Sequence, residues 1–415
     1  MGKIELDHTG SGSGVTLSSD GTDLLLDGTA IGGGGAALEL YAENPSSPTA
    51  PSAVGNNSVA IGSGSVSGSA ASDDNAVAIS TSATVSGSDG IAIGRLTSAA
   101  QYGTAIGRLS VASAYGSTAL GANTDATANE AVAIGWTAQS TGVAAVALGN
   151  SYASGTDSFA AAIANNTSSY GATGANSVAI GSLAKASNSD ALALGDRANS
   201  SATASSAIGR QASATGNSSV SIGTSSAAST SNSVAISTSA IASGNGSISV
   251  GGYSTAGGDR GVSIGVGASS SIVGKFAYSN GGIAFGGYFP MHQTTSDATP
   301  TALTTDGSAA GTTDQVILPN NSAYAFHGTI VARQQASAGT ASAAWKVEGL
   351  IRREGSAGTT VLVNSATTVL DNTPGWGLAL SADTTNGGLA ITVTGAASTN
   401  IRWVATIHTS EVTYA

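Results

Sequence analysis

The chain repeats a short segment, and one copy of it is Ser177-Val178-Ala179-Ile180-Gly181. The same order of small, apolar, small and apolar residues followed by glycine recurs on both sides of this copy. Its last position returns every 14 residues, at Gly181, Gly195, Gly209, Gly223, Ser237, Gly251 and Gly265. A register held over so many copies indicates a solenoid of stacked repeats rather than a disordered low-complexity chain.

Within each copy the apolar residues alternate with small ones, which is the two-residue period of a β-strand. A second, weaker strand pattern lies half a period away, as in Ala240-Ile241-Ala242-Ser243-Gly244. Two strands and two turns per repeat predict one coil of a parallel β-solenoid. We expect the two apolar positions to form the core of the repeat: Val59, Ile61, Val132, Ile134, Val178, Ile180, Val220, Ile222, Val262 and Ile264.

The small residue between the two apolar positions is expected to contact another chain. Burial of two apolar side chains per 14 residues stabilises the coil by less than the conformational entropy lost in ordering it. A single chain is therefore expected to need partners. A face of small residues allows close packing of a second backbone. The predicted inter-chain contacts are Ala60, Ala133, Ala179 and Ala193.

The composition narrows the classes of function. Only 9% of the 415 residues are charged, with 24 acidic and 13 basic side chains and a net charge of −11. No basic patch is available to neutralise a phosphate backbone, so nucleic acid is not expected as a partner. The absence of Cys excludes disulfides and Cys-ligated metals. No apolar run reaches the roughly 18 to 20 residues that span a bilayer, and the first residues lack a secretion signal, so neither membrane insertion nor export is expected.

Changes in the pattern divide the chain into three predicted parts. Residues 1–52 form an acidic N-terminal attachment module of short strands and loops. Residues 53–286 form a shaft of about 16 coils with a bulkier cap at its end. Residues 287–415 lose the 14-residue period and contain longer alternating strands separated by turn signals, which predicts an antiparallel β-sandwich of jelly-roll type. The whole chain is therefore expected to be all-β.

Two resemblances to known families rest on these segments. The Ser-Val-Ala-Ile-Gly units with their 14-residue period resemble the head repeats of trimeric autotransporter adhesins, from about Asn56 to Gly286. This resemblance implies a left-handed parallel β-roll, three copies of which associate around one axis. The segments Gln315-Val316-Ile317-Leu318-Pro319 and Trp345-Lys346-Val347-Glu348-Gly349 resemble C-terminal domains of marine bacteriophage fibre proteins.

Candidate site residues are few. Trp376 follows Pro374-Gly375 and Trp136 follows the glycine that ends a repeat, so these two are the candidates for stacking on a receptor sugar, with packing as the competing interpretation. His327 and His408 fall on predicted strands and could form a metal ring around an oligomer axis, but ordinary polar strand positions are the favoured interpretation. We expect no metal site and no cofactor.

Catalysis is also not expected. Cleavage of a glycan requires two carboxyl groups ~5 to 9.5 Å apart, and the shaft carboxylates do not recur at one position of the coil. They are Asp73, Asp74, Asp89, Asp125, Glu130, Asp157, Asp190, Asp196 and Asp259. The chain is therefore predicted not to be an enzyme.

The sequence and its resemblances together predict a structural fibre of a virion, tail fibre or capsid fibre, assembled in the host cytoplasm. Its expected partners are two further copies of itself, other virion proteins at the N-terminal module, and a host cell-surface glycan or protein at the C-terminal domain. The alternatives are a bacterial surface adhesin and a glycan-degrading tailspike.

Overall fold

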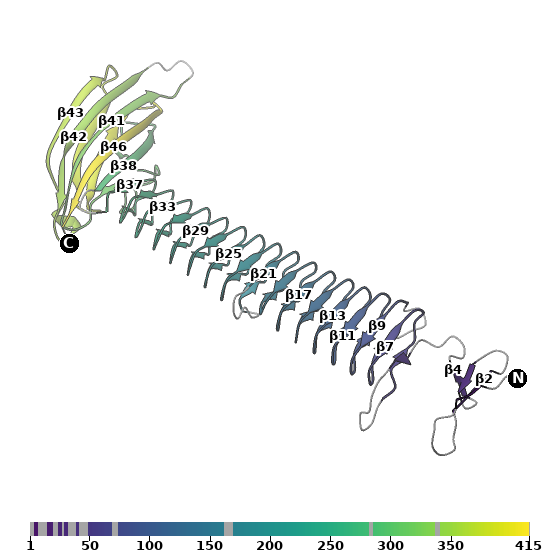
Figure 1. Cartoon of the computed structure of the whole chain (residues 1–415). Coiled ribbons are helices and arrows are strands. Elements are labelled where there is room, and N and C mark those ends of the chain that lie inside the picture. Colours follow the sequence, from purple (N-terminus) through teal and green to yellow (C-terminus); the bar gives the residue numbers. More distant parts are fainter. Residues whose placement is uncertain are drawn as a thin grey trace. The chain divides into compact units, whose positions relative to one another are not determined.

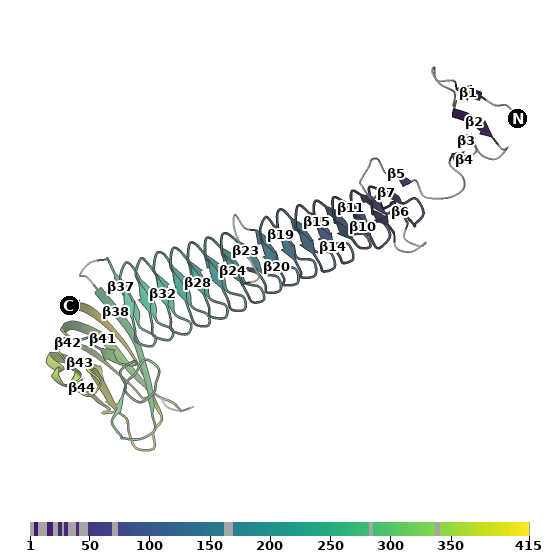
Figure 2. The ribbon, with the colours of Figure 1, turned by 90° about the horizontal axis from the view of Figure 1, so that it is seen from below.

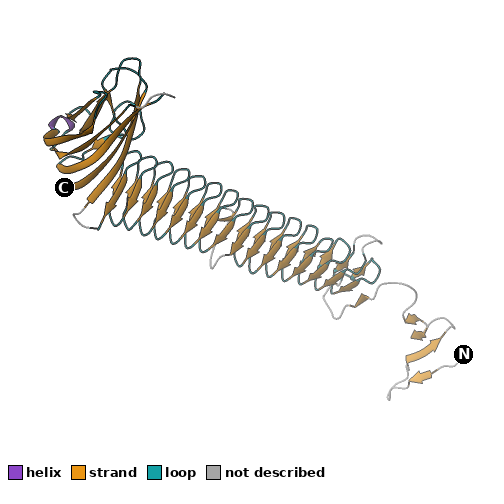
Figure 3. Ribbon diagram, turned by 90° about the horizontal axis from the view of Figure 1, so that it is seen from above, coloured by secondary structure: helices purple, strands orange, loops and turns teal. Residues whose placement is uncertain are grey.

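The computed structural model describes residues 49–68, 74–161, 169–281, 285–336 and 341–414, together with the backbone of five short strands nearer the N-terminus. The chain forms two compact units, residues 1–144 and 145–415, and each is described by itself. Strands account for nearly all of the described regular structure, with one 3-10 turn, η1 (Ala357–Thr359) (Figure 3). The all-β prediction is confirmed.

Near the N-terminus of the first unit, four strands pair antiparallel in chain order: β1 (Ile4–Leu6), β2 (Val15–Ser19), β3 (Leu24–Leu26) and β4 (Thr29–Ile31). A fifth strand, β5 (Glu39–Leu40), pairs in parallel with β7 (Val59–Ile61). The remainder of the predicted attachment module, up to residue 48, lies outside the described residues.

The coils of the first unit each contain one three-residue and one two-residue strand. The three-residue strands are β7, β9 (Val77–Ile79), β11 (Ile91–Ile93), β13 (Thr104–Ile106), β15 (Thr118–Leu120) and β17 (Val132–Ile134). The two-residue strands are β6 (Ser52–Ala53), β8 (Val66–Ser67), β10 (Thr84–Val85), β12 (Ser98–Ala99), β14 (Val111–Ala112), β16 (Asp125–Ala126) and β18 (Gln139–Ser140). Each strand pairs in parallel with the same strand of the next coil, so equivalent residues lie side by side.

The second unit continues the same pattern. Its three-residue strands are β19 (Val146–Leu148), β21 (Phe159–Ala161), β23 (Val178–Ile180), β25 (Leu192–Leu194), β27 (Ser206–Ile208), β29 (Val220–Ile222), β31 (Val234–Ile236), β33 (Ile248–Val250) and β35 (Val262–Ile264). Its two-residue strands are β20 (Tyr152–Ala153), β22 (Gly171–Ala172), β24 (Lys185–Ala186), β26 (Asn199–Ser200), β28 (Ser213–Ala214), β30 (Ala227–Ala228), β32 (Ile241–Ala242), β34 (Thr255–Ala256) and β36 (Ser269–Ser270). Figure 2 shows the two strand types on opposite sides of each coil. The predicted parallel β-solenoid is confirmed.

The structure reverses the predicted roles of the apolar and small residues. The central residue of each three-residue strand is Ala or Ser and is fully buried inside its own coil. Ala60, Ala133, Ala179 and Ala193 are among these residues, so their side chains cannot contact another chain. The predicted core residues point outward instead. Val59, Ile61, Val132, Val178, Val220, Ile222 and Val262 are half-buried, and Ile134, Ile180 and Ile264 are exposed. The reason is the narrow interior, which is lined on both sheets by Ala and Ser side chains.

Glycine ends most three-residue strands because the turn there needs a left-handed backbone and has no space for a side chain. Gly195 has a φ of +133°, and a Cβ at this position would lie 2.6 Å from the carbonyl oxygen of Gly209 in the next coil. Ser237 occupies the equivalent position with a φ of 113°. The conformation is therefore accessible to a small residue, at a cost in strain.

Replacing Gly195 with Ala is expected to lower the free energy of unfolding by about 1 to 3 kcal/mol, because it adds both left-handed strain and a backbone clash. Gly267 is the matched control, because a Cβ there meets nothing within 4 Å although its φ is also positive, at +69°. Chemical denaturation of both variants measures the difference. An equal loss in the two variants would show that contact between coils does not restrict the Gly195 position.

After the last coil the chain enters a C-terminal domain of two antiparallel sheets (Figure 1). The first sheet has the order β38 (Phe285–Thr295), β46 (Ile401–Thr413), β41 (Ser322–Gln334), β42 (Ser342–Arg353) and β43 (Val361–Asp371). In the second sheet β45 (Gly388–Thr394) pairs with β44 (Gly377–Asp383) on one side and with β39 (Thr301–Ala302) and β40 (Val316–Ile317) on the other. One hydrophobic core, which includes Phe289, Met291, Trp345, Ile391 and Trp403, lies between them. The predicted antiparallel sandwich is confirmed.

The solenoid and the C-terminal domain share a strand. The segment predicted as a cap, around Ser271 to Tyr278, contains β37 (Phe276–Ser279). This strand pairs in parallel with β35 of the last coils and antiparallel with β38 of the first C-terminal sheet. The hydrogen-bonded sheet therefore runs without a break from the coils into the C-terminal domain.

Candidate functional site

A cavity of about 470 Å³ lies where the last coil meets the C-terminal domain. Its apolar lining comes from both parts and includes Ile272 of the last coil and Leu318 of the C-terminal domain. Charged side chains also line it, namely Lys275, Arg353 and Glu411. This combination of apolar walls and a few charged groups is the usual character of a binding or structural site, so we take the junction as the candidate site.

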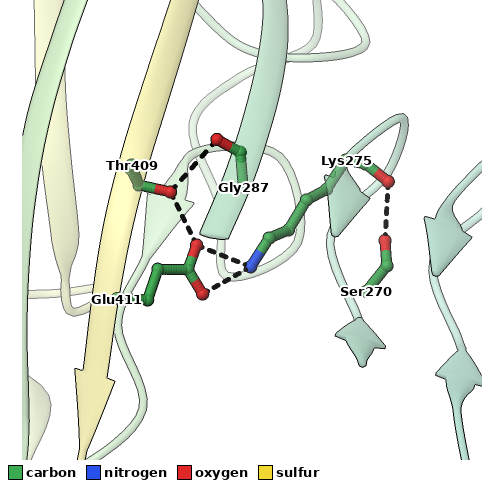
Figure 4. A network of polar contacts seen from close by, with 5 residues as sticks. All are labelled: Ser270, Lys275, Gly287, Thr409 and Glu411. Carbon is green, nitrogen blue, oxygen red and sulfur yellow. Dashed lines mark hydrogen bonds and ion pairs between the residues drawn. The ribbon is translucent and has the colours of Figure 1, made fainter. Parts of the chain in front are cut away.

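The centre of the junction is a buried ion pair between the last coil and the C-terminal strand. The Lys275 Nζ lies 2.9 Å from Glu411 Oε1 and 3.0 Å from Oε2 (Figure 4). Both side chains are more than nine-tenths buried. The Thr409 hydroxyl donates to Glu411 Oε1 over 2.7 Å, which satisfies a further lone pair of the carboxylate. Buried charges of this kind are stable only when they are paired and hydrogen-bonded.

The fold explains why a lysine occupies this position. Lys275 takes the place that Ser247 and Gly261 take in the two preceding coils, since Val262 donates to the Lys275 carbonyl as Ile248 donates to that of Gly261. In earlier coils this inward position faces the narrow interior. At the end of the solenoid no further coil covers it, and the long side chain reaches the C-terminal domain. The Ser270 hydroxyl fixes the Lys275 backbone by donating to its carbonyl over 2.8 Å.

Aromatic residues complete the surroundings of the pair. The Lys275 Nζ lies 5.1 Å from the centre of the Phe289 ring and 6.0 Å from that of Tyr324. Burial, the negative charge of Glu411 and a hydrogen bond to its carboxylate raise the pKa of the Tyr324 phenol. The phenol therefore stays neutral and acts as a hydrogen-bond donor.

The absence of a side chain at Gly287 leaves room for the contacts among Lys275, Thr409 and Glu411. A Cβ at this position would lie 2.6 Å from Glu411 Oε1 and 2.8 Å from both Lys275 Cε and Thr409 Oγ1. The Gly287 carbonyl oxygen also lies 3.3 Å from Thr409 Oγ1. The ammonium and the carboxylate neutralise each other, so this arrangement can act as an electrostatic link between the two parts of the unit.

Replacing Glu411 with Gln is expected to destabilise the second unit by about 3 to 5 kcal/mol, because the Lys275 charge stays buried without its partner. The double replacement Lys275→Met with Glu411→Leu removes both charges and is expected to recover much of that loss. Thermal unfolding followed by circular dichroism measures both. Glu354→Gln is the control, because the Arg352–Glu354 pair is exposed and 3.7 Å long and should contribute less than about 1 kcal/mol. A double variant no more stable than Glu411→Gln would contradict the role of charge.

The two tryptophans predicted as receptor contacts lie in different environments. Trp376 is only 5% exposed and packs 5.8 Å from the Trp403 ring centre within the C-terminal core, so the prediction for Trp376 is wrong. The preceding Pro-Gly turn suggested exposure, but the turn directs the ring inward. Trp136 is 72% exposed on a turn of the first unit and stays a candidate. Lys275 was not among the predicted site residues. A charged residue at an inward position of the repeat is the sequence signal that would have identified it.

No helix among the described residues is long and apolar enough to cross a bilayer. The described shaft carboxylates include one, Asp125, whose pKa is raised by burial. Asp73 lies outside the described residues.

The coils match a known repeat family, described as the YadA head domain repeat. The matched residues are 52–66, 98–124, 126–151, 172–198, 186–212, 200–226, 214–236 and 242–268. These segments of the shaft are similar to YadA head domain repeats. The predicted adhesin-like repeats are therefore confirmed, on the same segments that carried the resemblance. A comparison with curated proteins finds no match.

A comparison with solved structures finds a tailspike protein, gp49 from Acinetobacter baumannii bacteriophage Fri1, described as a capsular polysaccharide depolymerase. The two chains are 10% identical with a TM-score of 0.25, and the match covers 84% of this chain. It covers 66% of the tailspike chain, just under two thirds of its length. This finding contradicts the prediction that the chain is not an enzyme, and that prediction is withdrawn.

Proposed function

We propose that this chain is a fibre protein of a virion and works as a homotrimer. In this proposal residues 1–52 attach to other virion proteins, the YadA-like coils form the shaft, and residues 287–415 meet a glycan or protein on the host cell surface. The resemblance of the C-terminal segments to phage fibre domains supports the proposed location on a virion. Binding and spacing are its proposed tasks.

The observation that supports the proposed trimer is a column of apolar side chains on the outside of the three-residue strands. In the second unit the third strand position lies in register from coil to coil. It holds Leu148, Ala161, Ile180, Leu194, Ile208, Ile222, Ile236, Val250 and Ile264. All of these are half-buried or exposed in one chain. A continuous apolar face of this kind marks an interaction surface.

A second copy of the same chain is the partner that fits this face best. The first strand position runs parallel to the column, from Val146 to Val262, and holds only apolar residues apart from Ser206. Neither position carries a charge, so identical copies meet without repulsion. The 14-residue spacing is the same in every copy, and closed symmetry around one axis lets all copies bury their faces at once.

The receptor surface is proposed on the exposed side of the first C-terminal sheet. The three tryptophans of residues 287–415 lie in the core, so they do not supply the anchors that a receptor site needs. The exposed side presents Val331, Val404 and a row of Tyr and His residues instead. Threefold repetition would strengthen each weak contact by avidity.

Antibodies against the full chain test the proposal. We expect them to label projections of the virion, and we expect the purified protein to reduce adsorption of that virus to its host. Labelling of the surface of a producing bacterium, without labelling of a virion, would favour a bacterial adhesin and contradict the proposal. Incubation with host polysaccharide, followed by a reducing-sugar assay, tests separately for depolymerase activity.

A further inference from the structure

Four side chains form a row across the exposed side of the first C-terminal sheet. Tyr288 of β38 lies opposite His408 of β46, and His408 lies opposite His327 of β41. His327 lies opposite Glu348 of β42 in turn. Both histidines and Glu348 are exposed, and Tyr288 is half-buried. Residues far apart in the sequence are thus brought together by strand register alone.

The two imidazole rings of this row are held face to face. Their centres are 5.3 Å apart and their planes differ by 11°. The Tyr288 ring contacts His408 from the other side, with centres 5.0 Å apart and planes at 61°. Directly opposed residues of antiparallel strands have Cβ atoms ~4.5 to 5.5 Å apart, so the backbone keeps the rings within reach of a common ligand.

Charged groups of both signs lie near the rings. Glu348 is the neighbour of His327 in the row, and its carboxylate lies 3.6 Å from Lys346 Nζ in a pair that is more than half exposed. Such an exposed pair contributes little stability, so the Glu348 carboxylate can exchange the ammonium for another cation. The next row on one side holds Ser410, Ala325 and Leu350, which carry no charge. The next row on the other side holds Thr406, Thr329 and Lys346.

We propose that the paired imidazoles of His327 and His408 bind a divalent transition-metal ion, such as Zn²⁺, Ni²⁺ or Cu²⁺. Neutral imidazole is a preferred ligand of these ions, with metal–nitrogen distances of ~2.0 to 2.1 Å for zinc. Binding requires the two stacked rings to rotate so that one nitrogen of each reaches the same ion. The described residues contain no group of three or more His, Asp or Glu that could hold a metal, so water completes the coordination.

The site is complete within one chain and does not depend on the proposed fibre function. Its affinity is expected to fall as the pH is lowered, because protons compete with the metal for the imidazole nitrogens. Copper is expected to bind more tightly than nickel or zinc, following the general order for divalent ions.

Titration of the untagged full chain with NiCl₂, followed by calorimetry, tests the proposal. We expect one ion per chain, with loss of this binding in both His327→Gln and His408→Gln. His292→Gln is the matched control, because His292 is also exposed on the first sheet but lies opposite Val404 rather than a histidine. It is expected to bind as the wild type does.

Electron paramagnetic resonance of the Cu²⁺-loaded protein gives a second readout, which should show two nitrogen ligands in the wild type and in His292→Gln. Circular dichroism establishes that the variants are folded. Binding that survives in the double variant His327→Gln with His408→Gln would overturn the proposal. A stoichiometry of one ion per three chains would also overturn it, because it would place the ion between copies.

Discussion

Ala228→Leu is expected to unfold the coils around it, whereas Ala227→Leu, one residue earlier in the same strand, is expected to leave them folded. Ala228 is fully buried and packs with Ala235, Ala240 and Ala242 inside the coil. Overpacking of a filled core usually costs ~1 to 3 kcal/mol. The cost here is expected at or above the upper end, because the interior is bounded by hydrogen-bonded backbone on both sides.

The matched variant places the same side chain outside the coil. Ala227 lies beside Ile241 of the next coil, where a large apolar residue already occupies the equivalent outward position. Thermal melting followed by circular dichroism compares the two variants with the wild type. Equal melting temperatures for both variants would mean that the interior is wider than its Ala and Ser lining indicates.

Replacing Ile180 and Leu194 with Asp in the same chain is expected to convert the proposed trimer to monomers. The two side chains are neighbours in the outward apolar column and are 38% and 39% exposed in a single chain. Three copies around one axis would bring six carboxylates together without counter-charges. Like charges juxtaposed in an interface cost several kcal/mol. Sedimentation equilibrium at micromolar concentration measures the change.

Ile241→Asp is the control for this experiment. Ile241 is also exposed, at 41%, but lies on the two-residue strands on the opposite side of the coil. Ile241→Asp is expected to leave the proposed trimer intact. Dissociation by Ile241→Asp would place the interface on that other side, and a monomeric wild type would remove the basis for the trimer.

The spacing of the repeat was sufficient to predict the stacking of the coils. Gly181 and Gly195 are 14 residues apart in the sequence, and the strands that they end, β23 and β25, pair with the same offset, Val178 opposite Leu192. A ladder of identical coils leaves no other register. The C-terminal strands were predictable for a related reason, since alternation of large apolar and polar residues over many positions defines a sheet with one buried side.

The orientation of the coil residues was not predictable from alternation alone. A period of two separates Ala179 from Val178 and Ile180 but does not state which set faces inward. Hydrophobicity favoured the larger residues, whereas the width of a coil with three-residue and two-residue strands admits only the smaller ones. The ion pair was hidden for a different reason, because Lys275 and Glu411 are 136 residues apart and meet only through the pairing of β37, β38 and β46.

The strand shared by the solenoid and the C-terminal domain has a mechanical consequence. β37 carries a parallel ladder to β35 on one edge and an antiparallel ladder, from Phe276–Tyr288 to Ser279–Phe285, on the other. A pull on the C-terminal domain therefore reaches the last coil through rows of backbone hydrogen bonds that share the load, with the Lys275–Glu411 link beside them. Because β37 belongs to both ladders, a torque applied to the sandwich is transmitted to the coils.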